Sequence, residues 1–279
     1  MKTKKINSPL LSVVLTTYNE RKDFFVLCIN SVLEQTYSNF ELIIVFEPTD
    51  YNIGFIKELT KNDARVIIII SDQNRGFVKS LNIGVKQSSG NFVARIDSDD
   101  FCEKERFQLQ MDYLIKNKDI DVIGTNINLI NDANEVVGKR YYKQSFLDIK
   151  KAFLLSTSIA HPTVILRKKC LLMYGLYDEN FIYSEDLELW LRLIKNECKF
   201  ANLDKCLVNY RVRSIDENRN SAHWRYNYRA RLRHSFGIWN PLSAITTISF
   251  ALLMSLLPVK LLNILIASSL SNKLKGKKV

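Results

Sequence analysis

Cysteine is scarce in this chain, and its spacing shows no pairing pattern. The five cysteines are scattered and none belongs to a C-x-x-C pair; they are Cys28, Cys102, Cys170, Cys198 and Cys206. A disulfide framework or a structural zinc site needs cysteines at close, recurring spacings, so the sequence argues against both. The pattern fits a protein of a reducing cytosol.

Other signals are also missing. The first residues, Met1–Lys5, lead into a strand-like run without the apolar core or cleavage site of a signal peptide, so we do not expect secretion. A glycine-rich phosphate loop such as G-x-G-x-R is absent near that run, which disfavours a nucleotidyltransferase. The 279 residues contain no internal repeat or low-complexity tract, so we expect one large domain, or one domain with an appendage.

Positive charge is in excess. Forty Lys and Arg residues against 29 Asp and Glu give a net charge of +11, and the isoelectric point is near 9.3. Such a balance favours an anionic partner, which is a nucleic acid, a membrane surface or a phosphorylated substrate. Charge alone does not choose among the three.

The first hundred residues alternate short apolar runs with helical stretches. The expected strands are Leu11–Thr16, Phe40–Phe46, Val66–Ile70 and Asn91–Ile96, and the expected helices are Arg21–Gln35, Asn52–Asp63 and Phe77–Gln87. Continuous apolar strands that alternate with helices indicate a parallel sheet covered on both faces, and hence the α/β class. Such sheets bind ligands at the carboxyl ends of their strands.

The second half of the chain is less regular. We expect helices at Glu103–Lys116 and Ser184–Lys195, a strand pair at Val122–Ile130 and Glu135–Tyr142, and a further strand at Pro162–Arg167. Apolar residues at helical spacing support the helix that begins near Ser184.

An acidic stretch, Asp97-Ser98-Asp99-Asp100, directly follows the fourth expected strand. In an extended chain Asp97 and Asp99 point the same way, because side chains alternate with a period of two. Two carboxylates at a strand's carboxyl end can hold a hard divalent cation, which would neutralise a diphosphate leaving group. The alternative is a solvated acidic turn that caps the next helix.

The stretch Thr16–Glu20 closes the first expected strand. Its tyrosine and asparagine could stack on a nucleobase and hydrogen-bond to it. The alternative is a helix cap, since Asn19 before an acidic first turn suits a helix start.

Several motifs in order and in register resemble the family 2 glycosyltransferases. They are Ser12–Glu20, Ser31–Tyr37 with Phe40–Val45, Asn74-Arg75-Gly76 with Leu81–Gly84 and Ser89-Gly90, and Ala94–Asp100. The resemblance extends from about Leu11 to Arg213. It implies a GT-A fold, in which a Rossmann-like nucleotide-binding half is joined to an acceptor-binding half. It also implies an inverting transfer of a sugar from a nucleotide diphosphate to an acceptor hydroxyl, as in bacterial surface-polysaccharide synthesis.

The resemblance also implies roles for single residues on the donor side. Tyr18, Glu20 and Glu47 would face the base and ribose, Asp97 would lie near the ribose, and Asp99 would coordinate Mg²⁺ or Mn²⁺. Other donor-binding positions carried over from the motifs are Thr17, Asn74 and Gly76.

A second acidic signal is Ser184-Glu185-Asp186, where Ser184 is a plausible N-cap. Acids in a first helical turn complement the helix dipole, which is a sufficient structural reason for them. In the family the matching aspartate, here Asp186, takes the proton from the acceptor hydroxyl as that oxygen attacks the anomeric carbon. We expect Glu185 and His161 on the acceptor side.

Two departures from the family pattern bear on the donor. The usual acidic stretch after the second strand is one residue shorter here, Phe46–Asp50, so the reach of Glu47 differs. Arg213 stands where many members have a histidine. Arg213 cannot ligate a cation, but it can clamp phosphate oxygens and so neutralise part of their charge.

The C-terminal region changes character twice. Arg225, Arg229 and Arg233 lie on one helical face of a basic, aromatic stretch, and Pro241–Val259 then has 19 residues without a charge. That run is almost long enough for a ~30 Å hydrocarbon core. Basic residues flank both ends, which favours in-plane or re-entrant helices at an anionic leaflet over a single span. Docking within the protein or a dimer is the remaining alternative.

We therefore expect a catalytic domain over residues 1–216, a basic linker helix over 217–240, and an apolar membrane-associating segment with a basic tail over 241–279. The expected partners are a nucleotide-diphosphate sugar of the UDP-sugar class, a lipid-linked saccharide acceptor and the cytoplasmic face of the inner membrane. Two rival functions remain: a sugar-nucleotide binding protein without catalysis, and a nucleic-acid-binding protein, which only the charge suggests.

Overall fold

The structure is a computed structural model that describes residues 8–212, 217–258 and 261. The strands are β1 (Leu11–Thr17), β2 (Phe40–Phe46), β3 (Val66–Ile70), β4 (Phe92–Asp97), β5 (Phe101–Cys102), β6 (Val122–Ile130), β7 (Val136–Arg140), β8 (Ile165–Arg167) and β9 (Phe200–Arg211). The helices are α1 (Lys22–Leu33), α2 (Ile53–Thr60), α3 (Phe77–Gln87), α4 (Arg106–Lys116), α5 (Phe146–Ala152), α6 (Lys168–Tyr174), α7 (Glu185–Lys195), α8 (Glu217–His234) and α9 (Pro241–Leu256), with 3₁₀ turns at His161–Thr163 and Ser235–Gly237.

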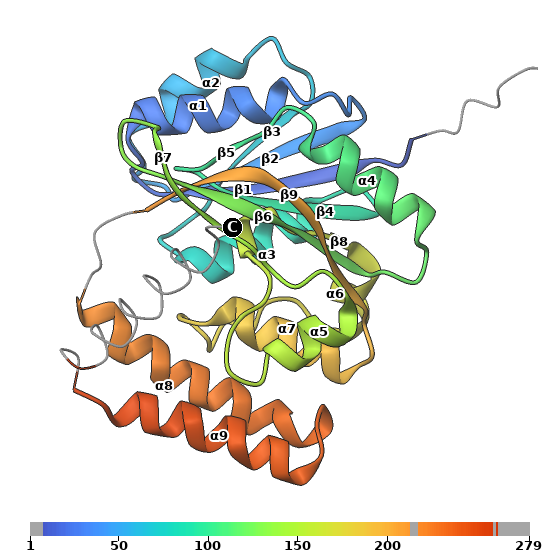
Figure 1. The fold of residues 1–279 in the computed structure, drawn as a ribbon. Coiled ribbons are helices and arrows are strands. Elements are labelled where there is room, and N and C mark those ends of the chain that lie inside the picture. The colour runs from blue at the N-terminus through green and yellow to red at the C-terminus, as the bar shows by residue number, and fades with distance from the viewer. Residues whose placement is uncertain (1–7, 213–216, 259–260, 262–279) are drawn as a thin grey trace, which may run out of the picture.

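The strands form one mixed sheet in the order β3-β2-β1-β4-β8-β6-β9-β5, with β7 paired to β6 (Figure 1). The first four strands in this order are parallel to one another, as the sequence predicts. Beyond β4 the sheet turns mixed, because β8 runs antiparallel to both of its neighbours. The carboxyl ends of β1, β2 and β4 therefore lie at one edge, which is where ligands bind in such sheets.

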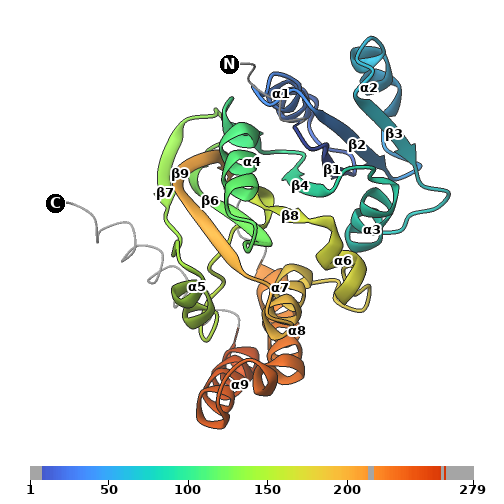
Figure 2. The same ribbon diagram turned by 90° about the vertical axis from the view of Figure 1, so that its right-hand side faces the viewer.

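Two hydrophobic clusters cover the two faces of the sheet. Along β1, Leu11, Val13 and Leu15 pack with α1 and α4, while Val14 packs on the opposite face with α3 and with Trp190 of α7. Figures 1 and 2 show α1, α2 and α4 over one face and α3, α6 and α7 over the other. This is the layered arrangement that near-continuous apolar strands require, and it confirms the predicted α/β class.

Three expected element boundaries are wrong by three residues. The helix expected over Asn52–Asp63 ends at Thr60. Pro162 lies in a 3₁₀ turn, so the strand expected from Pro162 begins only at Ile165. The helix expected from Glu103 begins at Arg106, because Phe101 and Cys102 first pair with β9. We did not predict β9 at all, since polar residues such as Asn202 and Asp204 interrupt its apolar pattern; its long pairing with β6 is a tertiary feature.

The C-terminal region forms two helices that pack side by side, α8 and α9 (Figure 1). Helix α8 also contacts α7, which joins this pair to the rest of the domain. In the part of the chain that the structure describes, no helix has the length and apolarity needed to cross a membrane.

Candidate active site

Three aspartates cluster at the end of β4. Asp97 is the last residue of the strand, and Asp99 and Asp100 follow in the turn. One carboxylate oxygen of each lies within 4.8 Å of the others. Magnesium and manganese prefer oxygen ligands, so the donor set and its spacing fit a divalent cation.

Within this cluster Asp100 has a supporting role. Its side chain is buried, and its Oδ1 accepts a hydrogen bond of 2.8 Å from the backbone N–H of Arg211 in β9. Burial and the charges of Asp97 and Asp99 raise the pKa of Asp100 well above its usual value. Asp100 thus fastens β9 to the turn and leaves the more accessible Asp97 and Asp99 as the predicted donor-side pair.

Arg95 lies beneath this turn and pairs with Asp97. Its Nη1 donates to Asp97 Oδ2 at 2.8 Å, and its side chain is buried. Arg95 thus forms an ion pair within the protein. The guanidinium of Arg95 therefore neutralises part of the negative charge of Asp97.

The loop after β1 is held by the loop after β2. Asp50, which is buried, accepts a hydrogen bond from the backbone N–H of Asn19 at 2.9 Å and contacts the hydroxyl of Thr17 at 3.4 Å. The Tyr51 hydroxyl donates to the backbone oxygen of Glu20 at 2.7 Å. These bonds leave Tyr18 57% exposed at the strand end, where an aromatic ring can stack on a base.

The helix-cap interpretation of Asn19 is wrong. Helix α1 has Arg21 at its N-cap position, without a side-chain capping bond. Asn19 instead adopts a φ of 53° and accepts a hydrogen bond from the backbone N–H of Tyr51. Its conformation shapes the loop after β1 rather than the start of α1.

Glu47 supports the loop before α3. Its carboxylate accepts hydrogen bonds from the backbone N–H groups of Arg75 and Gly76, at 2.7 and 2.9 Å, and from the hydroxyl of Ser80 at 2.9 Å. Gly76 has a φ of +77°, a conformation that favours glycine. Glu47 thus holds the turn that carries the exposed Asn74, and direct contacts of Glu47, Asn74 and Gly76 with a donor stay predictions.

His161 and Glu185, both predicted on the acceptor side, cluster with Tyr177. His161 and Tyr177 are buried, and Glu185 is half-buried. His161 Nε2 lies 2.7 Å from the Tyr177 hydroxyl, and its Nδ1 lies 3.9 Å from Glu185 Oε1. Burial, with the nearby charge of Arg95, lowers the pKa of His161 well below its usual value. Burial, with the neighbouring Asp186, raises the pKa of Glu185 to about 8. At neutral pH this cluster therefore carries little charge.

Asp186 lies in the first turn of α7, beside this cluster. It is half-buried, and its Oδ1 accepts a hydrogen bond from the backbone N–H of Leu187 at 2.7 Å. Ser184 occupies the N-cap position but makes no capping bond, because it adopts a left-handed φ of 56° and its hydroxyl contacts His223 of α8. The predicted N-cap position of Ser184 is confirmed, but its hydroxyl does not cap the helix.

Glu185 at this helix start holds its proton to a higher pH than a free carboxyl does, because burial and the neighbouring Asp186 raise its pKa to about 8. A carboxyl that keeps its proton at neutral pH suits hydrogen bonding better than proton abstraction. This favours Asp186 over Glu185 as the predicted base.

The pKa of Glu185 leads to a prediction about stability. Folding raises this pKa from 4.5 to about 8, so the folded protein keeps a proton that the unfolded chain releases. The free energy of unfolding should therefore fall as pH rises from 4.5 to about 8, by at most about 1.4 kcal/mol per pH unit. Glutamine cannot ionise. The melting temperature of Glu185→Gln minus that of the parent should therefore increase as pH rises from 5 to 8, by up to ~2–4 °C per pH unit. Thermal unfolding of both proteins with a chelator present measures this; an equal difference at both pH values would contradict it.

The two acidic sites belong to one electrostatic environment. The charges of Arg95 and Asp97 at the end of β4 act on Glu185 in α7, and Arg95 also acts on His161. Residues 97 and 185 are far apart in sequence, so only the fold brings the donor-side and acceptor-side residues together. The candidate site is the region between β4 and the start of α7.

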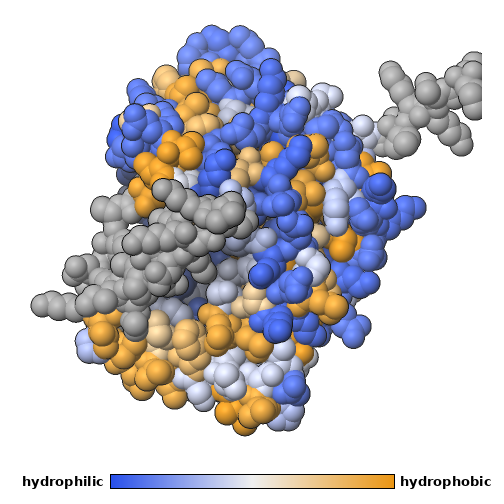
Figure 3. All heavy atoms as spheres, viewed as in Figure 1, coloured by the Kyte–Doolittle hydropathy of each residue, from blue (hydrophilic) through white to orange (hydrophobic). Residues whose placement is uncertain are grey.

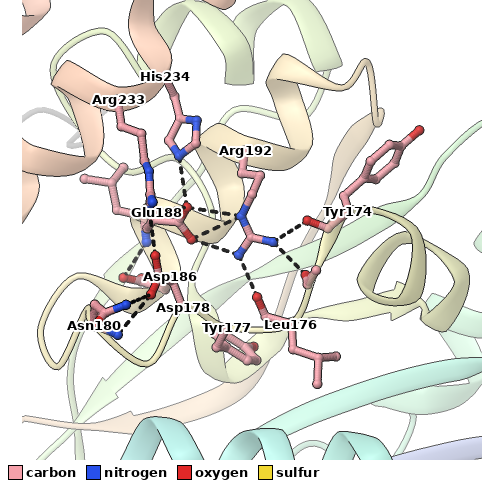
Figure 4. Close-up of polar contacts among 12 residues, drawn as sticks. Tyr174, Leu176, Tyr177, Asp178, Asn180, Asp186, Glu188, Arg192, Arg233 and His234 are labelled. Atoms are coloured by element: carbon pink, nitrogen blue, oxygen red, sulfur yellow. Dashed lines mark hydrogen bonds and ion pairs between the residues drawn. The ribbon is translucent and has the colours of Figure 1, made fainter.

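A second polar cluster holds the chain that leads into α7 (Figure 4). Buried Glu188 forms an ion pair of 2.8 Å with Arg192, whose guanidinium also donates to the backbone oxygens of Tyr174 and Leu176. Although burial opposes it, hydrogen bonds from His234 and Arg192 lower the pKa of Glu188. His234 Nε2 lies 2.9 Å from Glu188, so α8 helps to hold the loop that contains Tyr177.

The roles of the predicted donor residues stay predictions, and one of these residues, Arg213, lies outside the described part of the chain. The supporting residues Asp50, Tyr177 and Glu188 were not predicted, because each has a partner distant in sequence and none belongs to a recognisable spacing.

The parallel part of the sheet ends at a carboxylate cluster, and a second acidic pair lies at the start of α7. This arrangement is that of a glycosyltransferase by class. The chain belongs to glycosyl transferase family 2, since residues 12–172 match the family model of that description.

Relatives support this membership. An uncharacterised glycosyltransferase of Methanocaldococcus jannaschii is 32% identical over 76% of this chain and 74% of its own length. The O-antigen biosynthesis glycosyltransferase WbnJ of Escherichia coli is 35% identical over 73% of this chain and 80% of its length. WfgD of the same organism, a UDP-Glc:alpha-D-GlcNAc-diphosphoundecaprenol beta-1,3-glucosyltransferase, is 30% identical over 75% of this chain and 81% of its length.

Among solved structures, S. aureus TarS in complex with UDP-GlcNAc superimposes with a TM-score of 0.66 at 19% identity. The match covers 86% of this chain and 71% of that chain. At this identity the likeness supports the GT-A fold and no more.

Proposed function

We propose that this chain is an inverting glycosyltransferase that moves a hexose or an N-acetylhexosamine from a UDP-sugar to a hydroxyl of a lipid-linked saccharide, at the cytoplasmic face of the inner membrane. The observation that carries the proposal is the pairing of a cation-type carboxylate cluster at the end of β4 with Asp186 and neutral Glu185 at the start of α7. One side suits a diphosphate leaving group, and the other suits a proton acceptor.

The residues of this chain divide the reaction between them. Tyr18 stacks on the base, and the backbone turn held by Glu47 lines the donor side. A Mg²⁺ or Mn²⁺ ion held by Asp99 beside Asp97 would neutralise the diphosphate as its bond to the sugar breaks. Asp186 takes the proton of the acceptor hydroxyl while that oxygen attacks the anomeric carbon from the opposite face, which inverts the configuration.

The proposed class of acceptor rests on the substrates and pathways that the names of the relatives state. WfgD acts on a diphosphoundecaprenol-linked sugar, and WbnJ and the amylovoran enzyme AmsE of Erwinia amylovora belong to polysaccharide biosynthesis. We assign the same class of acceptor to this chain, with His161 and Glu185 on the acceptor side. A role for nucleic acid is not part of this proposal, since the charge excess has a sufficient partner in the diphosphate and the lipid headgroups.

The test is a panel of UDP-, GDP- and dTDP-sugars, each incubated with purified protein and Mn²⁺ or Mg²⁺, with release of nucleoside diphosphate as the readout. We expect release from a UDP-sugar, and faster release when a polyprenyl-diphosphate saccharide is added. Tight binding of a nucleotide sugar without release, with or without acceptor, would instead support a non-catalytic binding protein. Sequence-selective affinity for nucleic acid at physiological salt would support the other rival function.

A further inference from the structure

Helix α9 has two different apolar faces. One face packs against the domain through small or flexible residues, namely Ala244, Thr247, Ala251 and Met254. Thr247 lies within hydrogen-bonding distance of Arg231, a buried arginine of α8, at 2.7 Å. Helix α9 is thus a fixed part of the folded domain.

The opposite face exposes large aliphatic side chains. Leu242, Ile245, Leu252, Leu253 and Leu256 are 40–77% exposed, and their spacing of 3, 7, 1 and 3 residues places them on one side of a helix. We call these five residues the α9 stripe. Figure 3 shows hydrophobic residues gathered along the lower edge of the molecule, where Figure 1 places α8 and α9.

We infer that the α9 stripe is a lipid-contacting surface, which lies in the plane of an anionic bilayer and holds the catalytic domain against it. A contiguous exposed apolar surface marks an interaction site. Helix α9 has no charged residue, and the two exposed polar residues on the same face as the stripe, Thr246 and Ser249, carry only a hydroxyl group each. The stripe therefore offers no ionic group that could pair with a protein partner.

Charge complementarity favours a lipid bilayer as the partner of the α9 stripe. The chain carries a net charge of +11, and the sequence that follows α9 contains Lys260, Lys273, Lys275, Lys277 and Lys278. An apolar helix face that is followed in the sequence by clustered lysines matches the acyl chains and anionic headgroups of a bilayer surface.

The stripe is also mechanically connected to the acceptor side of the site. Ser184, two residues before Asp186, contacts His223 of α8 at 3.1 Å, and the next residue, Trp224, packs edge-on against Phe250 of α9 with ring centroids 5.8 Å apart. Two helix diameters of about 10 Å each therefore separate the start of α7 from the stripe. A headgroup-linked saccharide at the membrane surface lies within that reach, a step that rests on the proposed function.

The test compares substitutions on the stripe with matched substitutions elsewhere, all in the full chain. Leu253→Gln with Leu256→Gln removes two stripe leucines, whereas Leu147→Gln with Leu172→Gln removes two leucines of similar exposure on α5 and α6. In flotation with phosphatidylcholine–phosphatidylglycerol vesicles, the parent and the control should float, and the stripe variant should lose about tenfold or more of its binding. Floated protein should remain partly bound at high salt, since inserted side chains are not screened.

The outcome is separable from the proposed function, because binding of the UDP-sugar should be equal in all three proteins. Flotation of the stripe variant like the parent, or no flotation of the parent, would overturn the inference. So would a dimer of the parent that the stripe variant dissociates without any vesicle binding, which would make the stripe a dimer surface. Truncation after Trp239 is a poorer test, because it also removes Thr247 and with it a hydrogen bond of buried Arg231.

Discussion

Asp186→Asn should lower turnover by about 10²–10⁴-fold while leaving donor affinity nearly unchanged. The amide keeps the shape of the side chain and can still accept the 2.7 Å hydrogen bond from the backbone N–H of Leu187, so the start of α7 should stay intact. What it loses is the ability to take a proton. Steady-state transfer and equilibrium binding of the UDP-sugar, measured on the same preparations, separate the two effects.

The matched control is Asp178→Asn. Asp178 lies on the loop that leads into α7 and pairs with Arg233 on the surface of α8, where no proton transfer is proposed. Its replacement should leave turnover close to that of the parent. Turnover of Asp186→Asn within a factor of two of the parent would refute Asp186 as the base and support a role in stabilising the helix start.

Asp99→Ala should abolish transfer and also weaken donor binding. The diphosphate would lose the cation that Asp99 is proposed to hold, and a cation of this kind acts on both the bound donor and the breaking bond. Donor titrations with and without Mn²⁺ or Mg²⁺ measure this, and the metal-dependent part of the affinity should vanish in the variant.

A second group in the described part of the chain supplies the control. Asp121, Cys170 and Cys198 also bring ligand atoms within 4.8 Å of one another, far in sequence from Asp99. Asp121→Asn should leave the metal dependence of donor binding unchanged. If the parent remains active after exhaustive chelation, the metal role of Asp99 is wrong, and Arg213 becomes the better candidate for neutralising the diphosphate.

Local patterns predicted the donor half of this protein well. The strands around Val13, Leu42 and Ile96 are short apolar runs, and a run of this kind has few alternatives to a doubly covered parallel strand. The position of Asp97 and Asp99 follows from the end of such a run. The family resemblance carried the same residues and added the role of Asp186.

The acceptor half was less predictable. Strand β9 has polar residues in its middle, and its place beside β6 depends on pairing across most of the domain. The contacts of single polar residues could not be predicted from the sequence either. Glu47 was expected at the base and ribose, yet its carboxylate accepts bonds from the loop before α3, because that loop returns over β2 in the folded chain.

By itself the sequence determined the α/β class, the strand end that carries Asp97 and Asp99, the helix start that carries Asp186, and the apolar character of α9. Each of these depends on neighbours within a few residues, through hydrophobic periodicity. Only the tertiary structure decided that Asp100 supports β9, that Glu185 keeps its proton beside Asp186, and that α9 buries one face and exposes the other. Burial and pairing across the domain set those properties, because the free energy of a charged or apolar group depends on which distant residues surround it.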